Sequence, residues 1–458
     1  MTDIMHFNIV ASLSPANVYV DDTWLNTPVC TDPDGAGLAT SYGQDAFAGI
    51  QIGINAAATG GNIHVEPGDY AGSIDLNKDA IVLVNGDINV TGDLTIHQGT
   101  FTAPTGNMSL SGDFTHTAGT FTHNSGTLLM NGTSQQYLGG DLVTVFNNIT
   151  VNNTSGVVLN QDENVNGILT MNNGQLTLGS NDLILGTAAS STGSFSSSNM
   201  IVADSSGALC KQFGSTGSYT YPIGDATGTA NYSPASLNFH SGTFNPGQVC
   251  INLTDAKHPN NGSPQNYLSR YWTASSSGIS DFSTTALFNY DGSSEDIVGS
   301  ENLIYALKYD NNTWTTGALV DPATHSFSMP VDSFSDFTGG NTPTAVNLAG
   351  FNAFPLDDSI LIQWGTIWEN DLIGFNLYRS SSMNAEKFLL NQPIIPAEGI
   401  GGYGGVWYEY TDSSVEIGNT YYYWLEFINV NGVVMHGPVP VIMIRQIYMP
   451  LLVSPTDN

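Results

Sequence analysis

Three consecutive stretches of twenty residues decide the fold: GDINVTGDLTIHQGTFTAPT (86–105), GNMSLSGDFTHTAGTFTHNS (106–125) and GTLLMNGTSQQYLGGDLVTV (126–145). Glycine occupies positions 1, 7 and 14 of each stretch, and apolar residues occupy positions 3 and 5. Because side chains alternate along a strand, positions 3 and 5 face the same side. Three short strands per twenty residues, each opened by a glycine that permits a corner, predict one coil of a β-solenoid.

The apolar positions predict continuous ladders inside the stacked coils. The residues expected to point inward are Ile88, Val90, Met108, Leu110, Leu128 and Met130, together with Leu94, Phe101, Phe114 and Phe121. Less regular coils continue to about residue 186. A β-sandwich with tight hairpins is the alternative interpretation, but three aligned stretches favour the solenoid.

The composition of the 458-residue chain sets its broad class. The chain has 8 Lys+Arg against 40 Asp+Glu, a net charge of −32, 50 glycines and 41% hydrophobic residues. Good helix formers are scarce, so a folded all-β protein of two to four domains is expected. The charge excludes binding to nucleic acid through its phosphates and disfavours anionic membranes. No stretch has the roughly 20 apolar residues of a membrane span. An acidic, soluble surface of this kind fits a secreted, extracellular protein.

Upstream of the repeat, an amphipathic stretch predicts a helix that caps the open end of the solenoid. Residues 45–57 (DAFAGIQIGINAA) place Phe47, Ile50 and Ile54 at helical spacing, with Asp45 as the N-cap. Together with VYVDDTW (18–24), TDPDGAG (31–37) and VEPGDY (65–70), this region resembles the N-terminal part of pectin-lyase-like right-handed β-helix surface proteins. The resemblance covers about residues 17–186 and implies a right-handed parallel β-helix whose first coil is covered by that helix.

Two further domains are predicted after a Ser-rich stretch, beyond which the glycine period is lost. Residues 187–344 hold eight alternating segments that predict a β-sandwich. Here YPIGD (221–225) and RYWT (270–273) resemble a module common in bacterial surface proteins. Residues 345–445 hold seven predicted strands, with Trp364 as a buried candidate and a tyrosine run at 421–423. This last region, IQWGTIWENDLIGFNLYRSSS (362–382) above all, resembles the fibronectin type III-like domain that closes many bacterial surface proteins.

The two ends of the chain are apolar. Residues 1–16 end in Ser14-Pro15-Ala16, which is typical of the end of a signal peptide, although a first strand is the alternative. Residues 446–458 form an apolar tail with the strand-like residues Ile447, Tyr448, Leu451 and Leu452. We expect this tail to add as a strand to a sheet edge in a neighbouring subunit. Packing against its own domain, or a sorting or anchoring role, are the alternatives.

Candidate ligand and modification sites are few. Asp32 and Asp34 in TDPDGAG, with Asp21 and Asp22 nearby, are candidate Ca²⁺ ligands, because an Asp-x-Asp-Gly loop brings carboxylates together; a plain Asx turn is the alternative. No other cofactor is expected. Cys210 and Cys250 lie in one predicted domain and are a candidate disulfide, with unpaired cysteines as the alternative. Asn-x-Ser/Thr sequences permit glycans at Asn89, Asn107, Asn131, Asn148, Asn252 and Asn311.

Pectin-lyase-like folds include sugar-cleaving enzymes, so the resemblance also implies a candidate carbohydrate-active site. A uronate lyase needs a base and cations, yet Lys78 is the one Lys or Arg up to residue 186. A glycoside hydrolase needs two carboxylates that face each other across a cleft. The acidic pairs Asp162-Glu163 and Asp21-Asp22 do not meet this need, because neighbouring side chains point to opposite faces of a strand.

We therefore predict that the chain is not an enzyme. We expect an extracellular structural protein, a subunit of a cell-surface filament, sheath or surface layer, which self-associates through strand addition or solenoid stacking. An adhesin that binds glycans or surfaces is the alternative, and a carbohydrate-active β-helix enzyme is the more remote one.

Overall fold

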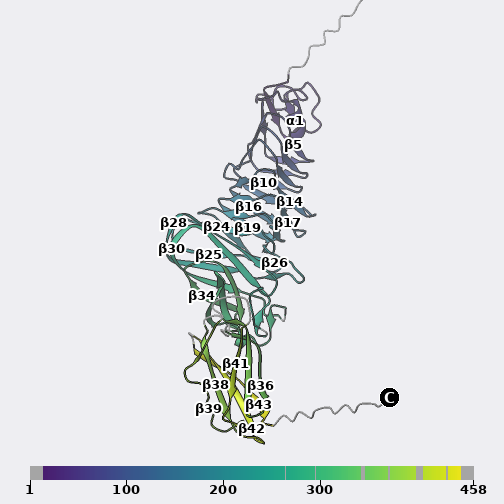
Figure 1. The fold of residues 1–458 in the computed structure, drawn as a ribbon. Coiled ribbons are helices and arrows are strands. Elements are labelled where there is room, and N and C mark those ends of the chain that lie inside the picture. Colours follow the sequence, from purple (N-terminus) through teal and green to yellow (C-terminus); the bar gives the residue numbers. More distant parts are fainter. Residues whose placement is uncertain are drawn as a thin grey trace, which may run out of the picture. The chain divides into compact units, whose positions relative to one another are not determined.

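The computed structural model describes residues 14–263, 265–293, 295–341, 346–369, 372–398, 406–429 and 432–444. The chain divides into two compact units, Met1–Gly340 and Asn341–Asn458. Both are built from strands, and the predicted all-β fold is confirmed, with a β-solenoid in the N-terminal region and further β-sheets after it (Figure 1). Among the described helices, none is both long and apolar enough to cross a membrane.

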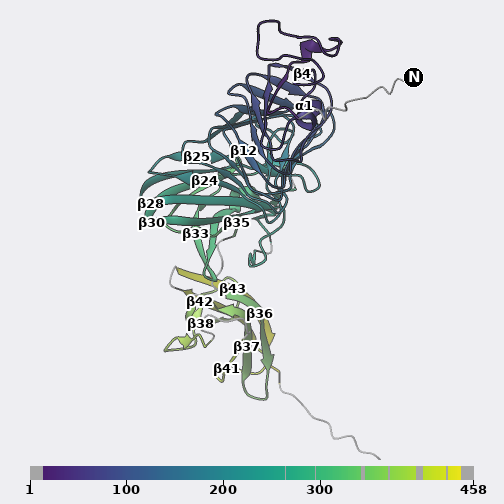
Figure 2. The same ribbon diagram turned by 90° about the horizontal axis from the view of Figure 1, so that it is seen from above.

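The solenoid is right-handed and has about eight turns, stacked as parallel sheets (Figures 1 and 2). The first sheet contains β1 (Asn17–Val20), β2 (Ala46–Phe47), β3 (Asn62–Val65), β6 (Ile81–Val84), β9 (Thr100–Thr102) and β12 (Thr120–Thr122). The second contains β4 (Gly68–Tyr70), β7 (Ile88–Val90), β10 (Asn107–Leu110), β13 (Thr127–Met130), β16 (Asn148–Asn152), β19 (Ile168–Asn173) and β22 (Ser190–Gly193). The third contains β5 (Ile74–Leu76), β8 (Leu94–Ile96), β11 (Phe114–His116), β14 (Gln136–Gly140), β17 (Val157–Leu159), β20 (Leu176–Thr177), β23 (Ile201–Val202), β26 (Ile223–Asp225) and β27 (Asn231–Tyr232).

The register between turns follows the twenty-residue repeat. Ile88 pairs with Met108 and Met108 with Leu128 in the second sheet, and all three side chains are buried. In the other two sheets Leu94 pairs with Phe114 and Phe101 with Phe121. The predicted interior ladders are therefore confirmed, although Phe121 is only partly buried where the first sheet ends at β12.

The helix at the start of the solenoid is shorter than predicted. Helix α1 spans Ile50–Ala56, buries Ile50 and Ile54, and contacts β1, β2, β3 and β5 of the first turns. The expectation that Asp45 is its N-cap was wrong, because Gly49 occupies that position. The Asp45 carboxylate instead accepts hydrogen bonds from the backbone of Thr40 and Ser41, and Ala46–Phe47 pair as a strand with β1. A short 3₁₀ helix, η1, covers Asp22–Trp24.

A fourth sheet connects the parallel strands of the solenoid to the antiparallel strands that follow it. It begins with β15 (Thr144–Phe146), β18 (Glu163–Val165), β21 (Leu183–Leu185) and β24 (Leu209–Phe213), all parallel. It continues with β28 (Ala235–Thr254), β30 (Tyr271–Asn289), β35 (Asp336–Gly340), β32 (Tyr305–Asp310) and β33 (Thr313–Leu319), while β25 (Ser218–Tyr221) pairs with β28 and β34 (Ser326–Val331) with β30. A small sheet joins β29 (Tyr267–Leu268) to β31 (Ile297–Val298), and η2 covers Glu301–Leu303. Parallel pairing thus continues beyond residue 186, as far as β24 and β26.

Strands β28 and β30 are longer than the sequence pattern suggests. Two of the eight segments that the sequence pattern predicts as separate strands, SPASLNFH (233–240) and QVCINLTD (248–255), are joined in the 20-residue β28. Its ladder with β30 shifts register between Phe239 and Gln248, where glycine and proline interrupt the alternation. These irregularities bend a strand without ending it, as β-bulges do. One hydrophobic core runs from Val18 in the first turn to Phe337 in β35.

The second unit contains two sheets around one core of its own. One sheet orders β36 (Val346–Pro355), β37 (Ile360–Glu369) and β41 (Trp407–Asp412). The other contains β38 (Leu372–Ser380), β39 (Phe388–Leu389), β40 (Ile395–Pro396), β42 (Thr420–Asn429) and β43 (Gly432–Ile442). Trp364 is fully buried as predicted, and Tyr423 lies in the same core and donates its hydroxyl to Asp412.

Candidate functional site

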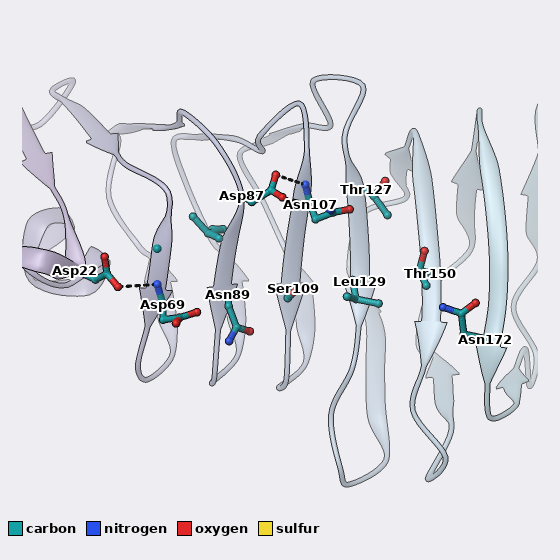
Figure 3. Close-up of a pocket in the computed structure, with 12 residues that line it drawn as sticks. Asp22, Asp69, Asp87, Asn89, Asn107, Ser109, Thr127, Leu129, Thr150 and Asn172 are labelled. Atoms are coloured by element: carbon teal, nitrogen blue, oxygen red, sulfur yellow. Dashed lines mark hydrogen bonds between the residues drawn. The ribbon is translucent and has the colours of Figure 1, made fainter.

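A shallow groove crosses the outer face of the second solenoid sheet. Its volume is about 510 Å³, and its floor is a row of outward-facing side chains on successive turns (Figure 3). The lining residues are Asp22, Gly68, Asp69, Asp87, Ile88, Asn89, Asn107, Ser109, Thr127, Leu129, Thr150 and Asn172. Adjacent parallel strands repeat about every 4.8 Å, so the groove offers a polar group at nearly every step.

Hydrogen bonds to the backbone hold the acidic end of the groove. The Asp69 amide donates to Oδ2 of Asp22 at 2.9 Å, and the Asn107 amide donates to Oδ1 of Asp87 at 2.8 Å (Figure 3). The lining residues include no cation and no aromatic ring. Amides, hydroxyls and carboxylates can accept and donate hydrogen bonds along an extended, uncharged ligand.

The groove was missed by sequence reasoning, although a signal was present. Its floor contains Asn89, Ser109 and Leu129, which are position 4 of the three aligned stretches. Position 4 lies between the two inward positions and therefore faces outward. The outward column, in which Asn89 and Ser109 are polar and Leu129 is not, could have been read from the same alignment that predicted the core.

The four candidate Ca²⁺ ligands each serve the local backbone. Asp21 accepts hydrogen bonds from the amide and hydroxyl of Thr23, and Asp32 accepts from the amides of Asp34 and Gly35. Asp34 accepts from the amide of Ala39 at 3.2 Å, and Asp22 accepts from the backbone amide of Asp69. In the part of the chain that the structure describes, these carboxylates do not gather into a group of three within 4.8 Å. A calcium site at these four residues stays a prediction, which the described geometry does not support.

The described groups of His, Cys, Asp and Glu include one cluster of three, Asp182 with Cys210 and Cys250. The two sulfur atoms are joined in a disulfide between the paired strands β24 and β28. Only the Asp182 carboxylate remains to bind a cation, so this cluster offers no metal centre. Cys30 is a free, exposed cysteine.

The asparagines of the candidate glycosylation sequences occupy different settings. Asn107 and Asn311 are exposed, while the remaining four, Asn89, Asn131, Asn148 and Asn252, are partly buried. Asn89 and Asn107 line the groove. The candidate assembly residues Ile447, Tyr448, Leu451 and Leu452 lie outside the described residues.

The described cations all have partners within the chain. Lys78 donates to the carbonyls of Asn55 and Ala57 at the end of α1, and Lys211 donates to three carbonyls beside β24. The others contact carboxylates, carbonyls, hydroxyls or aromatic rings: Lys257, Arg270, Lys308, Arg379 and Lys387. A polyanion would therefore meet a negative surface without a free cation among the described residues.

A polar cluster interrupts the solenoid core where the first sheet ends and the fourth begins. Thr144 links two buried groups: its amide donates to Oε2 of Glu163 at 2.7 Å, and its hydroxyl lies 3.0 Å from Nδ1 of His116. Burial raises the pKa of the Glu163 carboxyl to about 9, with Asp162 adding to the effect, and burial lowers the pKa of His116. Burial thus favours the uncharged form of both groups. Burial of these polar groups lowers the folding stability of this turn.

A second buried cluster joins the end of the solenoid to the antiparallel strands. Arg270 is fully buried and forms ion pairs with Asp225 at 2.7 Å and Asp296 at 2.9 Å, with the partly exposed Asp255 at 3.6 Å. Burial raises the pKa of Asp225 to about 6, against the opposing effect of Arg270. Asp225 and Arg270 belong to YPIGD and RYWT, so the two motifs meet in one ion pair.

Comparisons with known proteins add little to this geometry. No protein-family model matches the chain, and no curated protein matches it. A β-1,2-glucanase from Parabacteroides distasonis is similar at 10% identity and a TM-score of 0.16, over 52% of this chain. The match spans 37% of the glucanase chain, and a likeness this distant carries no argument about function. The fold itself defines the class: a β-solenoid protein with further β-sheets after the solenoid.

Proposed function

We propose that the chain is an extracellular structural protein, a self-assembling subunit of a surface filament, sheath or surface layer. In this proposal a β-sandwich module follows the β-helix, and a fibronectin type III-like domain closes the chain. The observation that carries the proposal is the single hydrophobic core that runs from Val18 to Phe337. A close-packed interior resists deformation, so a solenoid that shares its core with long antiparallel strands suits a stiff scaffold.

An oxidising, extracellular location is supported by the disulfide between Cys210 and Cys250. Disulfides persist mainly in such compartments. The acidic surface, whose described cations are all engaged internally, also suits a protein that stays soluble until it assembles.

A structural role without catalysis is supported by the hydrogen bonds of the groove carboxylates. Asp22 and Asp87 each accept a hydrogen bond from a backbone amide, so these two side chains help to hold the solenoid turns together. A screen of polysaccharides for depolymerisation, with and without Ca²⁺, tests this part of the proposal. Release of oligosaccharides that is lost in Asp69→Asn would overturn it.

Self-association is tested by electron microscopy and sedimentation velocity of the purified full chain. We expect ordered polymers, and we expect more of them at high salt, because screening weakens repulsion between copies that each carry a net charge of −32. A chain that stays monomeric at every salt concentration contradicts the proposal.

The route of assembly is tested separately on the tail. Deletion of residues 446–458, and substitution of Ile447, Tyr448, Leu451 and Leu452 by serine, should both abolish polymers if the tail adds as a strand. The serine variant is the matched control for chain length. Assembly unchanged in both variants would remove strand addition and leave solenoid stacking.

A glycan-binding adhesin is the second candidate, and the polar groove favours it. Side chains along the groove could bind the hydroxyl groups of an extended neutral glycan. Binding of neutral glycans that is lost when Asn89 and Ser109 are replaced by alanine would favour this candidate over a purely structural role.

A further inference from the structure

The outer face of the sheet formed by β36, β37 and β41 carries an unusual row of residues. Gly350 pairs with Gly365, and Gly365 pairs with Trp407, so two glycines and one tryptophan lie side by side across the three strands. Trp407 is 64% exposed. Such a row leaves space above two strands for one large side chain.

The indole of Trp407 fills this space by lying flat over the sheet. A Cβ atom on Gly365 would lie 2.8–3.0 Å from Cε2, Cδ2 and Cε3 of Trp407. These three ring atoms include both atoms of the ring junction, and they lie at nearly equal distances from the Cβ position. The face of the indole, and not its edge, therefore lies over Gly365. Cη2 at the far end of the ring would lie 3.7 Å from a Cβ on Gly350. One face of the indole therefore covers both glycines, and the opposite face is turned to solvent.

Polar side chains form the next row on the same outer face. Asn352 pairs with Gln363, and Gln363 pairs with Glu409, two residues along each strand from the first row. Residues two apart on a strand are about 7 Å apart, so these groups border the indole. Two amides and a carboxylate supply both donors and acceptors beside a flat aromatic surface.

We propose that Trp407 is a binding platform for a pyranose ring of a neutral glycan. The apolar C–H face of the sugar stacks on the indole, whose face carries the negative side of its quadrupole. The sugar hydroxyls then bind the amides of Asn352 and Gln363 and the carboxylate of Glu409. An apolar protein surface would instead leave this row of polar groups buried without partners, which is costly.

The charges select a neutral sugar over an acidic one. Glu409 is exposed beside the platform, and the three strands of this sheet contain no Lys or Arg. A uronate or sulfated sugar would be repelled. The site lies in the second compact unit, so it is independent of the solenoid groove and of the proposed structural role.

Two pairs of variants of the full chain test the platform, with cellohexaose, laminarihexaose and mannohexaose as probes in titration calorimetry and tryptophan fluorescence. We expect at least one hexasaccharide to bind, Trp407→Ala to weaken that binding at least tenfold, and Trp407→Phe to retain part of it. Gly365→Ala should also weaken binding, because its Cβ would displace the indole. Phe388→Ala is the matched control, because Phe388 is an exposed aromatic side chain (71%) in the other sheet of the same unit, and this variant should bind as the unchanged chain does.

Circular dichroism and the urea unfolding midpoint establish that the variants are folded. The proposal is overturned if none of the three hexasaccharides binds, or if Trp407→Ala binds as tightly as the unchanged chain. Binding that is lost with the groove variant Asn89→Ala/Ser109→Ala but kept in Trp407→Ala would assign the glycan to the groove and also overturn the platform.

Discussion

The regular coils over residues 86–130 and the joint between the solenoid and the antiparallel strands are stabilised in different ways. In the coils the same interior positions repeat at every turn, and a corner aspartate such as Asp93 accepts a hydrogen bond from the next turn. At the joint, single groups carry the structure: the buried Arg270 with its carboxylates, and the disulfide. In the coils, each repeated contact contributes little to the free energy of unfolding, so the loss of one is tolerated. At the joint, the loss of one partner leaves a buried charge uncompensated and is strongly destabilising.

The largest effect is expected at Arg270. Arg270→Met leaves Asp225 and Asp296 buried without a cation, and it should lower the free energy of unfolding by about 3–5 kcal/mol. Urea unfolding followed by circular dichroism measures this loss. Arg379→Met is the control, because Arg379 is partly exposed beside Asp412 and should cost less. Equal losses in the two variants would show that the joint is no more sensitive than the second unit.

The next effect is a pH dependence at Glu163. The pKa of its carboxyl is about 9 in the folded chain against an ordinary 4.5, so the folded state holds the proton. The buried, protonated carboxyl contributes its full share of stability below pH 4.5, and this share is lost as the pH rises toward 9. Glu163→Gln cannot ionise, so its stability relative to the unchanged chain should rise by up to about 1.4 kcal/mol per pH unit across that range. Urea unfolding of both proteins at pH 5, 6, 7 and 8 (about one pH unit apart) measures this difference in free energy of unfolding. A difference that stays constant over these pH values would contradict the buried, protonated state.

The smallest effect is expected at a corner of the regular coils. Asp113 accepts a hydrogen bond from the amide of Tyr137 at 2.8 Å. Asp113→Ala removes this acceptor and should cost about 1 kcal/mol, measured as a shift of the urea midpoint. Asp113→Asn keeps an acceptor oxygen and should be close to neutral. A loss from Asp113→Ala as large as that from Arg270→Met would erase the contrast between coils and joint.

The repeated parts of the fold could be predicted from the sequence, and the unique parts could not. Ile88, Met108 and Leu128 occupy one column because each turn places the same position in the same environment, so the pattern is visible without coordinates. Asp45 does not cap the helix, because Ala46–Phe47 pair as a strand with β1 and the helix begins only at Ile50. Helix propensity and capping are weak next to tertiary pairing.

The candidate sites were less predictable because they depend on residues far apart in the chain. Asp225 and Arg270 are 45 positions apart, and nothing in either motif alone indicates that they meet. The Trp407 platform requires Gly350 and Gly365 on two other strands, a register that sequence alone does not give. The sequence indicates only that Asp162 and Glu163 point to opposite faces of a strand, and it does not show that Glu163 is buried and accepts a hydrogen bond from the Thr144 amide.

Native-state hydrogen exchange of the full chain tests the central claim most directly, because it reports the stability of each strand separately. If the buried joint ties the solenoid to the antiparallel strands, the slowest amides of the first unit should lie in β24, β28 and β30. Arg270→Met should speed their exchange while leaving β7, β10 and β13 little changed. Slowest exchange in β7, β10 and β13, unaffected by the substitution at Arg270, would contradict the account.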